Sequence, residues 1–351
     1  SAPTRNGGAP FALYKEKHEG PLLRCLCGGG GGGGGGAMVA NADEEMATLT
    51  LAKPRFANDG LHEVAVLAHR FTLNVFRDRS LLASRTIQAL VAGLALGSLY
   101  RDVGMGPSGI AERLGFLAFM LTFLLSSSIE ALPIFLKERA VLLHETSRGA
   151  YRISSYLLAH FLVFVPFLLF IAMVFSIPAY FLIGLARTPA AFAFFVLTVW
   201  LVLLMANSFV AFFSALAPDY IMGSSLVSGA MGAFFLFSGY FISRENMPDY
   251  WRFMHYISLF KYPLDALLIN EYSSMHAPHD CLVRGGAASS TSGVGGTTCM
   301  FTAQDELRSL GLDPTWKWPS IAVIVGFLAF YRLLCYIVLK IKLSKITNSS
   351  S

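Results

Sequence analysis

Most residues that could carry chemistry in this sequence lie in one charged segment, residues 137–152, between two long apolar runs. Four of them are basic: Lys137, Arg139, Arg148 and Arg152. Each flanking run can cross a bilayer, since a membrane helix needs about 20 apolar residues, so the charged segment must lie outside the lipid. Short basic loops stay in the cytoplasm. We therefore expect this segment, the charged hinge, to be a cytoplasmic input point.

A single carboxylate, Glu130, lies inside one of these apolar runs, two residues after the end of the serine run Ser126, Ser127 and Ser128. An intramembrane acid is a functional candidate by default. The alternative is that Glu130 lies near the end of the span or is tied to a neighbouring helix. The residues alone leave both interpretations open.

Glu130 together with His144 or His160 could serve a membrane-embedded enzyme such as a lipid transferase. These groups would have to converge, yet Glu130 and His144 are about 21 Å apart along a continuous helix. The spacing therefore disfavours an enzyme. Turnover of a lipid by the chain without ATP would support one.

Motifs for other chemistry are missing from the sequence. It contains no H-E-x-x-H, C-x-x-C or G-x-S-x-G, and the glycine run at 28–36 is not followed by the Lys of a phosphate-binding loop. Cys25 and Cys27 alone offer too few ligands for a metal. We therefore predict no catalytic residues, no metal site and no ATP hydrolysis by this chain alone.

The composition is that of a multi-pass membrane protein. Mean hydropathy is +0.56, hydrophobic residues make up 54% and charged residues 14%. The net charge of +5 does not indicate a nucleic-acid partner, because the basic residues lie at the ends of apolar runs. Membrane lipid is the expected environment.

Six apolar runs predict an all-α protein with six transmembrane helices. Their approximate bounds are 82–100, 114–136, 157–185, 190–217, 221–242 and 321–339.

The remaining segments are assigned by composition. Residues 1–59 are predicted to be a disordered, Gly-rich linker, and 346–351 a short tail. Residues 61–79 predict an amphipathic, interfacial helix with Glu63 on its polar face. In the first span, Arg85 could extend to the cytoplasmic interface.

Charge sets the predicted orientation. Cytoplasmic flanks hold ten basic residues and the short outer turns three, so both termini are expected in the cytoplasm. Residues 243–317 then form a long outer loop, whose aromatic first part predicts re-entrant or interfacial helices. On this oxidising side Cys281 and Cys299 could form a disulfide, with free thiols or intermolecular bonds as alternatives.

Three stretches carry a resemblance to a known family: ERLGFLAFMLTFLLSSSIEALPIFLKERAVLLHETSRGAYRISSYLLAH, LMANSFVAFFSALAPDY and FFLFSGYFISRENMPDYWRFMHYISLFKYPLDALLINEY. They resemble the membrane domain of G-subfamily (white/brown-complex) ABC half-transporters, particularly those of plants. The resemblance covers about residues 60–345. It implies an ABC-2 type domain of the type V exporter class, preceded in the family by a nucleotide-binding domain that this sequence does not show.

The resemblance also implies site residues. The hinge residues Glu138, Arg139, Glu145 and Arg148 would pair with the nucleotide-binding domain, and Tyr240 and Phe241 would form an outer plug. The family's substrate cavity at the dimer axis matches Phe123, Ser126, Ser228, Gly232 and Phe235.

The resemblance favours half of an ATP-driven exporter that acts as a homo- or heterodimer in the plasma membrane. Expected cargoes are lipophilic or amphipathic compounds: lipids, cuticle or suberin precursors, sterols, phenylpropanoids or hormones. ATP and Mg²⁺ would act only in the complete transporter. The alternative is an ATPase-less regulatory or partner subunit of an intact half-transporter.

Overall fold

The computed structural model describes residues 59–77, 79–101, 103, 107–186, 188–241, 247–273, 281–284, 299–302, 307 and 310–350. The chain divides into two units, Ser1–Lys53 and Pro54–Ser351, and all described residues belong to the second. Apart from Asp59, the predicted linker lies outside the described residues.

The described part is built from helices, with one short β-hairpin. The elements are α2 (Gly60–Arg77), α3 (Arg79–Leu99), α4 (Pro107–Ser127), the 3₁₀ turn η1 (Ser128–Ala131), α5 (Leu132–Ser147), α6 (Ile153–Ile183), α7 (Pro189–Leu216), α8 (Tyr220–Leu236), η3 (Asp249–Trp251), α9 (Arg252–Ile257), α10 (Lys261–Ser273), β1 (Cys281–Arg284), β2 (Cys299–Thr302), η4 (Pro314–Trp316) and α12 (Lys317–Ser350).

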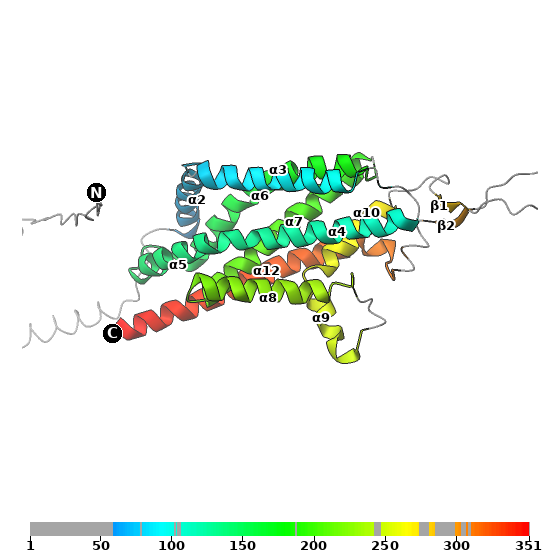
Figure 1. Cartoon of the computed structure of the whole chain (residues 1–351). Helices are drawn as coiled ribbons and strands as arrows, with labels where there is room; N and C mark the ends of the chain where they lie inside the picture. Colours follow the sequence, from blue (N-terminus) through cyan, green and yellow to red (C-terminus); the bar gives the residue numbers. More distant parts are fainter. Residues whose placement is uncertain are drawn as a thin grey trace, which may run out of the picture. The chain divides into compact units, whose positions relative to one another are not determined.

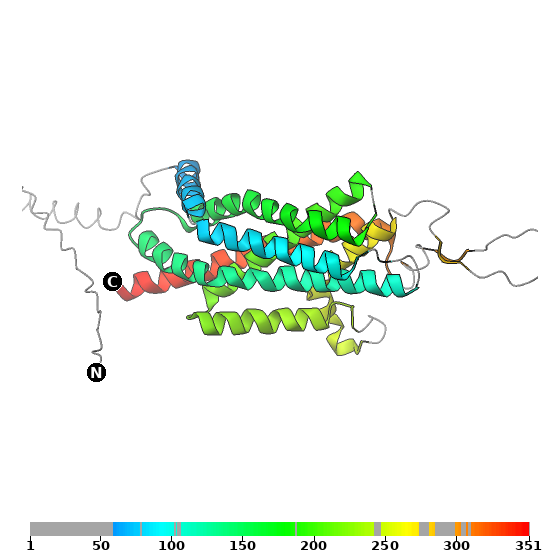
Figure 2. The same cartoon turned by 45° about the horizontal axis from the view of Figure 1, so that its top comes forward.

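The long helices form one bundle with two distinct ends (Figure 1). At one end lie α2, which runs across the bundle, and the C-terminal ends of α5 and α12. We call this the hinge end. At the opposite end lie α9 and α10, and we call this the α10 end. In both views α8 lies at the edge of the bundle (Figure 2).

Five helical segments among the described residues are long and apolar enough to cross a membrane. They are Leu82–Leu99, Gly109–Ser147, Ile153–Ile183, Pro189–Leu216 and Pro314–Ile346. The protein is therefore an integral, multi-pass membrane protein, and the all-α prediction is confirmed. The predicted span 221–242 is represented by α8, which has only 17 residues. The count of six spans stays a prediction.

The span predicted at 114–136 does not end before the charged hinge. Helix continues through η1 and α5 as one segment of 39 residues, and only residues 148–152 form a loop. The 3₁₀ turn has a local cause. Ser127 and Ser128 donate their hydroxyls to the Leu124 carbonyl oxygen at 2.9 and 3.2 Å, and Pro133 has no N–H to donate.

The centre of the bundle is α7, which has the largest buried share of the five spans. Two glycines bring α3 against α6. A Cβ added at Gly93 would lie 2.7 Å from the Phe175 carbonyl oxygen, and one at Gly97 would lie 2.9 Å from Leu182. Small residues are needed where membrane helices approach this closely.

Helix α2 confirms the amphipathic helix predicted at 61–79, except that Glu63 lies on the buried face and not on the exposed one. Leu67 and Phe71 are buried as expected. Glu63, predicted on the polar face, is also buried and accepts a hydrogen bond from the Arg152 backbone N–H at 3.2 Å. Glu63 faces inward because it completes the first turn of α6, whose Arg152 N–H has no partner within that helix.

The predicted outer loop begins with helical structure, as its aromatic composition indicates. The longer of its helices, α10, is buried from Pro263 to Tyr272 except at the half-buried Asp265, and it packs against α4, α7 and α12. Further along, β1 and β2 pair antiparallel. Much of the loop around these elements lies outside the described residues.

Candidate functional site

The inward face of α5 is held by partners within the chain. The Glu138 carboxylate accepts a hydrogen bond from the Tyr156 hydroxyl at 3.1 Å and lies 3.5 Å from His160 Nε2. The Arg139 guanidinium donates to the Ser214 carbonyl oxygen at the end of α7. These two residues, predicted to contact a nucleotide-binding domain, fasten α5 to α6 and α7.

The next turns of α5 are fastened to α2. Glu145 forms an ion pair with Arg70 at 3.3 Å and accepts a hydrogen bond from the Tyr151 hydroxyl at 2.7 Å. Burial and the Glu145 carboxylate raise the pKa of Tyr151 above its usual range, so the phenol stays protonated as a donor. Glu145 therefore links the charged hinge to α2.

The opposite face of α5 is exposed. Lys137, Val141, His144 and Arg148 follow one another at helical spacing, and all four are exposed, with Val141 at 48%. Of the predicted hinge residues, Arg148 alone lies on this face. We call these four residues the exposed face of α5.

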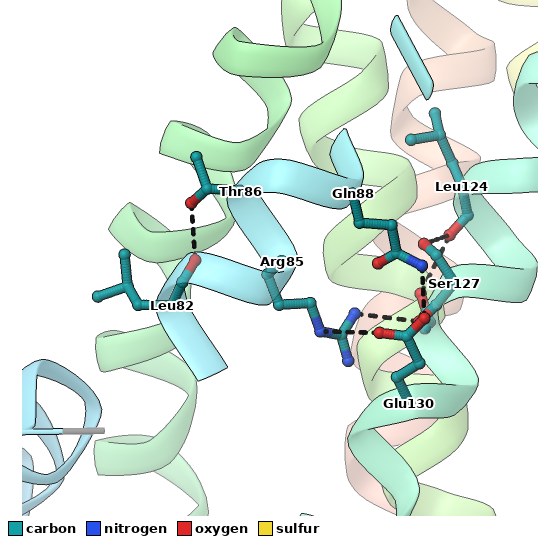
Figure 3. A network of polar contacts seen from close by, with 8 residues as sticks. Leu82, Arg85, Thr86, Gln88, Leu124, Ser127 and Glu130 are labelled. Carbon is teal, nitrogen blue, oxygen red and sulfur yellow. Dashed lines mark hydrogen bonds and ion pairs between the residues drawn. The ribbon is translucent and has the colours of Figure 1, made fainter. Parts of the chain in front are cut away.

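Glu130 is tied to a neighbouring helix (Figure 3). The Gln88 side-chain amide donates to its carboxylate, and Arg85 Nε lies 3.6 Å from it. Arg85 also donates to the Ser127 carbonyl oxygen at 3.0 Å. Arg85 is therefore paired with Glu130, whose side chain is 50% exposed, and the extension of Arg85 to the interface stays a prediction. His160 contacts Glu138 instead, and His144 is exposed, so the groups of the enzyme hypothesis do not converge.

A cavity that the sequence did not indicate is lined in part by Arg85 and Gln88, the two partners of Glu130. Its empty volume is about 700 Å³, open space at its mouth included, and α3 to α7 all contribute lining residues. The walls are mostly apolar, with Phe123 and Phe167 among them, and Arg85, Gln88 and Asn207 supply polar groups. The one sequence signal for this cavity was the three-residue spacing of Arg85 and Gln88, which places two polar side chains on the same face of an apolar helix.

The predicted cavity residues do not form one pocket within this chain. Phe123 lines the internal cavity and stacks on Phe175 with centroids 6.3 Å apart. Ser126 of α4 and Ser228 and Gly232 of α8 are exposed.

Phe235 packs with the predicted plug instead. Its ring centroid lies 6.3 Å from that of Tyr240 and 5.2 Å from that of Phe241, and the plug rings are 4.9 Å apart. These three rings form an aromatic cluster at the C-terminal end of α8.

Comparison with known proteins identifies the family. Residues 62–272, more than half of the chain, match the ABC-2 type transporter family. The chain belongs to this family. It is 50% identical over 285 residues to ABC transporter G family member 8 of Arabidopsis thaliana, covering 81% of this chain and 47% of the relative. It is 48% identical over 286 residues to member 23, covering 82% and 44%.

The ABC-2 match confirms the resemblance to the membrane domain of the G subfamily and supports a role in membrane transport. The chain spans about half the length of the curated relatives it matches. The sequence has no phosphate-binding loop, and the described residues include no group of three or more His, Cys, Asp or Glu that could hold a metal.

At the α10 end the ABC-2 domain contains a buried ion pair that sequence reasoning missed. Arg113 of α4 contacts Glu271 of α10, and both side chains are 4% exposed. Glu271 also accepts a hydrogen bond from the Ala186 backbone N–H at 3.1 Å. Burial raises the pKa of Glu271, whereas the Arg113 guanidinium and the Ala186 N–H oppose this rise. The partners are far apart in sequence, so no local pattern could pair them.

The predicted disulfide between Cys281 and Cys299 stays a prediction. The hairpin register places Cys281 opposite Thr302 and Cys299 opposite Arg284. The side chains of both cysteines lie outside the described residues.

Proposed function

We propose that this chain is the membrane half of an ATP-driven exporter of lipophilic or amphipathic compounds, acting as a dimer by alternating access. The observation that carries this proposal is the two-sided environment of α5. One face is fastened to α2, α6 and α7, and the other is exposed. A helix placed in this way can pass a displacement from a docked domain into the bundle.

The exposed face of α5 is the proposed docking surface. Lys137 and Arg148 make it basic, and His144 lies between them. A nucleotide-binding domain that presents acidic side chains would complement it. That domain, on the same polypeptide or on a partner, would hold ATP and Mg²⁺, and the hinge end would face the cytoplasm of a cell whose plasma membrane carries the exporter.

The exposed residues of α4 and α8 support a dimer. Phe119 is 55% exposed, and Ser126, Ser228 and Gly232 are exposed small residues. Small residues permit close helix contact within a membrane. We assign this surface to a second half-transporter, identical or different, so that the substrate cavity forms between the two halves. The Phe235, Tyr240 and Phe241 rings would then close an apolar path suited to lipophilic cargo.

Charge reversal on the exposed face tests the docking surface. In the complete transporter, Lys137→Glu combined with Arg148→Glu should reduce ATP-dependent export from inverted membrane vesicles at least tenfold, because the surface would repel an acidic partner. The matched control is Arg252→Glu at the α10 end, where the side chain is 43% exposed. Export by the double variant at the rate of the control, with equal protein in the membrane, would refute the docking role.

A second candidate function is an ATPase-less partner of an intact half-transporter. An immunoblot of source membranes with an antibody to residues after Lys340 separates the two. A band near twice 38.2 kDa would place the ATPase on the same polypeptide. A band at 38.2 kDa, together with co-purification of an intact half-transporter, would establish the partner role.

A further inference from the structure

A small cavity at the hinge end contains the guanidinium of Arg332 of α12, a half-buried residue whose Nη atoms are buried. The cavity lies between α5, α6, α7 and α12 and has an empty volume of about 350 Å³, open space at its mouth included. Arg332 lines it together with Arg139, Tyr156 and His160. Tyr156 and His160 lie near the start of α6, so the cavity is close to the helix ends of the bundle.

The guanidinium of Arg332 is only partly satisfied. Its Nε donates to the Ser208 hydroxyl at 3.0 Å, and the group lies 5.2 Å from the centre of the Phe161 ring. Nη1 and Nη2 are buried and have no hydrogen-bond partner among the residues that the structure describes. The Nη1 and Nη2 donors of Arg332 therefore have room for an acceptor from outside the described residues.

The missing acceptor has to carry negative charge. An arginine does not lose its proton in proteins, and a buried charge without a counter-charge is strongly unfavourable. The acid on α5 that faces this region, Glu138, is already engaged by Tyr156 and His160. Arg139 adds a second positive charge to the lining. Water could accept the two hydrogen bonds, but it could not balance the charge.

We infer that this cavity binds the oxyanion head group, phosphate or carboxylate, of a membrane amphiphile. The two Nη atoms of a guanidinium match two oxygens of such a group. The rest of the lining is mostly apolar, with Phe135, Leu157 and Leu339 among its residues, and this suits the first part of an acyl chain. Free phosphate is the other source of the same chemistry. The site stands independently of the proposed transport function.

The test measures binding to the full-length protein purified in detergent. The probes are dioleoyl phosphatidic acid, oleate, dioleoyl phosphatidylcholine and inorganic phosphate, followed by native mass spectrometry and thermal unfolding. We expect one phosphatidic acid or oleate per chain, and at least a tenfold loss of apparent affinity in Arg332→Gln. Lys345→Gln, which removes an exposed charge from the same helix, should bind as the wild type does.

The probes also separate the two sources. Binding of the anionic lipids without binding of inorganic phosphate assigns the site to a membrane amphiphile. Binding of inorganic phosphate alone assigns it to the free anion and overturns the lipid assignment. Equal binding of phosphatidic acid by Arg332→Gln and wild type overturns the site altogether.

Unfolding without added lipid gives an independent check. Arg332→Gln should then unfold at the wild-type temperature or above it, because the substitution removes an uncompensated charge. A marked fall in unfolding temperature under these conditions would overturn the inference, since Arg332 would then stabilise the protein without an anion.

Discussion

The two ends of the bundle hold their charges in opposite ways. At the α10 end, Arg113 and Glu271 form an ion pair in which each side chain is 4% exposed. At the hinge end, Arg70 and Glu145 form one in which the side chains are 46% and 30% exposed. A buried pair is costly to break, whereas an exposed pair contributes about 0–1 kcal/mol. The Arg113–Glu271 pair therefore fixes α4 to α10, whereas the Arg70–Glu145 pair can exchange partners at little cost.

The largest effect is expected from Glu271→Gln. The substitution removes the carboxylate from a buried arginine and should lower the free energy of unfolding by about 3–5 kcal/mol. Denaturant unfolding of the detergent-purified protein measures it. In the double variant Arg113→Met, Glu271→Leu, most of this stability should return. If the double variant is as unstable as the single one, the loss is not due to the unpaired charge.

A second effect at the same end depends on pH. Burial raises the pKa of Asp265 from 3.8 to about 7, and Lys261 opposes the rise. The pKa of Asp265 is higher in the folded state than in the unfolded state. Its contribution to the free energy of unfolding is therefore full below pH 3.8 and is lost as pH rises to about 7. Between these pH values the free energy of unfolding should fall by about 1.4 kcal/mol per pH unit at most.

Asp265→Asn tests this directly, since it should remove the decline in unfolding free energy between pH 4 and 7. Asp249→Asn is the control, because the Asp249 side chain is 87% exposed and its loss should leave the pH profile of the protein as it is. Identical profiles for wild type and Asp265→Asn would contradict the assignment.

The smallest effect is expected at the hinge end. Arg70→Ala should cost at most about 1 kcal/mol of unfolding free energy, because the pair is exposed and Glu145 keeps its bond to Tyr151. Added salt should reduce this difference further. A loss as large as that of Glu271→Gln would show that the two ends do not differ in the way described above.

The apolar runs predict the long helices well, because the need to satisfy every backbone group in lipid allows little else. The end of α8 is harder to predict. The helix stops at Leu236 because Gly239 has φ of +96° and the Phe237 carbonyl oxygen lies 3.0 Å from His255 Nδ1. Gly239 is a local signal, but the contact between Phe237 and His255 joins residues 18 positions apart and has none.

The candidate site was predictable only in part. The charges of α5 stand out in an apolar sequence, so their importance could be foreseen. Their partners could not, since Arg139 reaches α7 and Glu145 reaches α2 through tertiary packing. Likewise, Glu130 is conspicuous by itself, but its pairing with Arg85 depends on how α3 lies beside η1.

The unbroken run of helix through η1 also has a mechanical meaning. With 21 residues in α4 and 16 in α5, the two arms on either side of η1 are about 31 and 24 Å long at 1.5 Å per residue. Rotation of this lever about η1, as a rigid rod, would move the far end of α4 further than the end of α5. Arg113 anchors that far end to α10. Force applied at α5 would therefore concentrate at the 3₁₀ turn, whose hydrogen-bond geometry is poorer than that of the α-helices on either side.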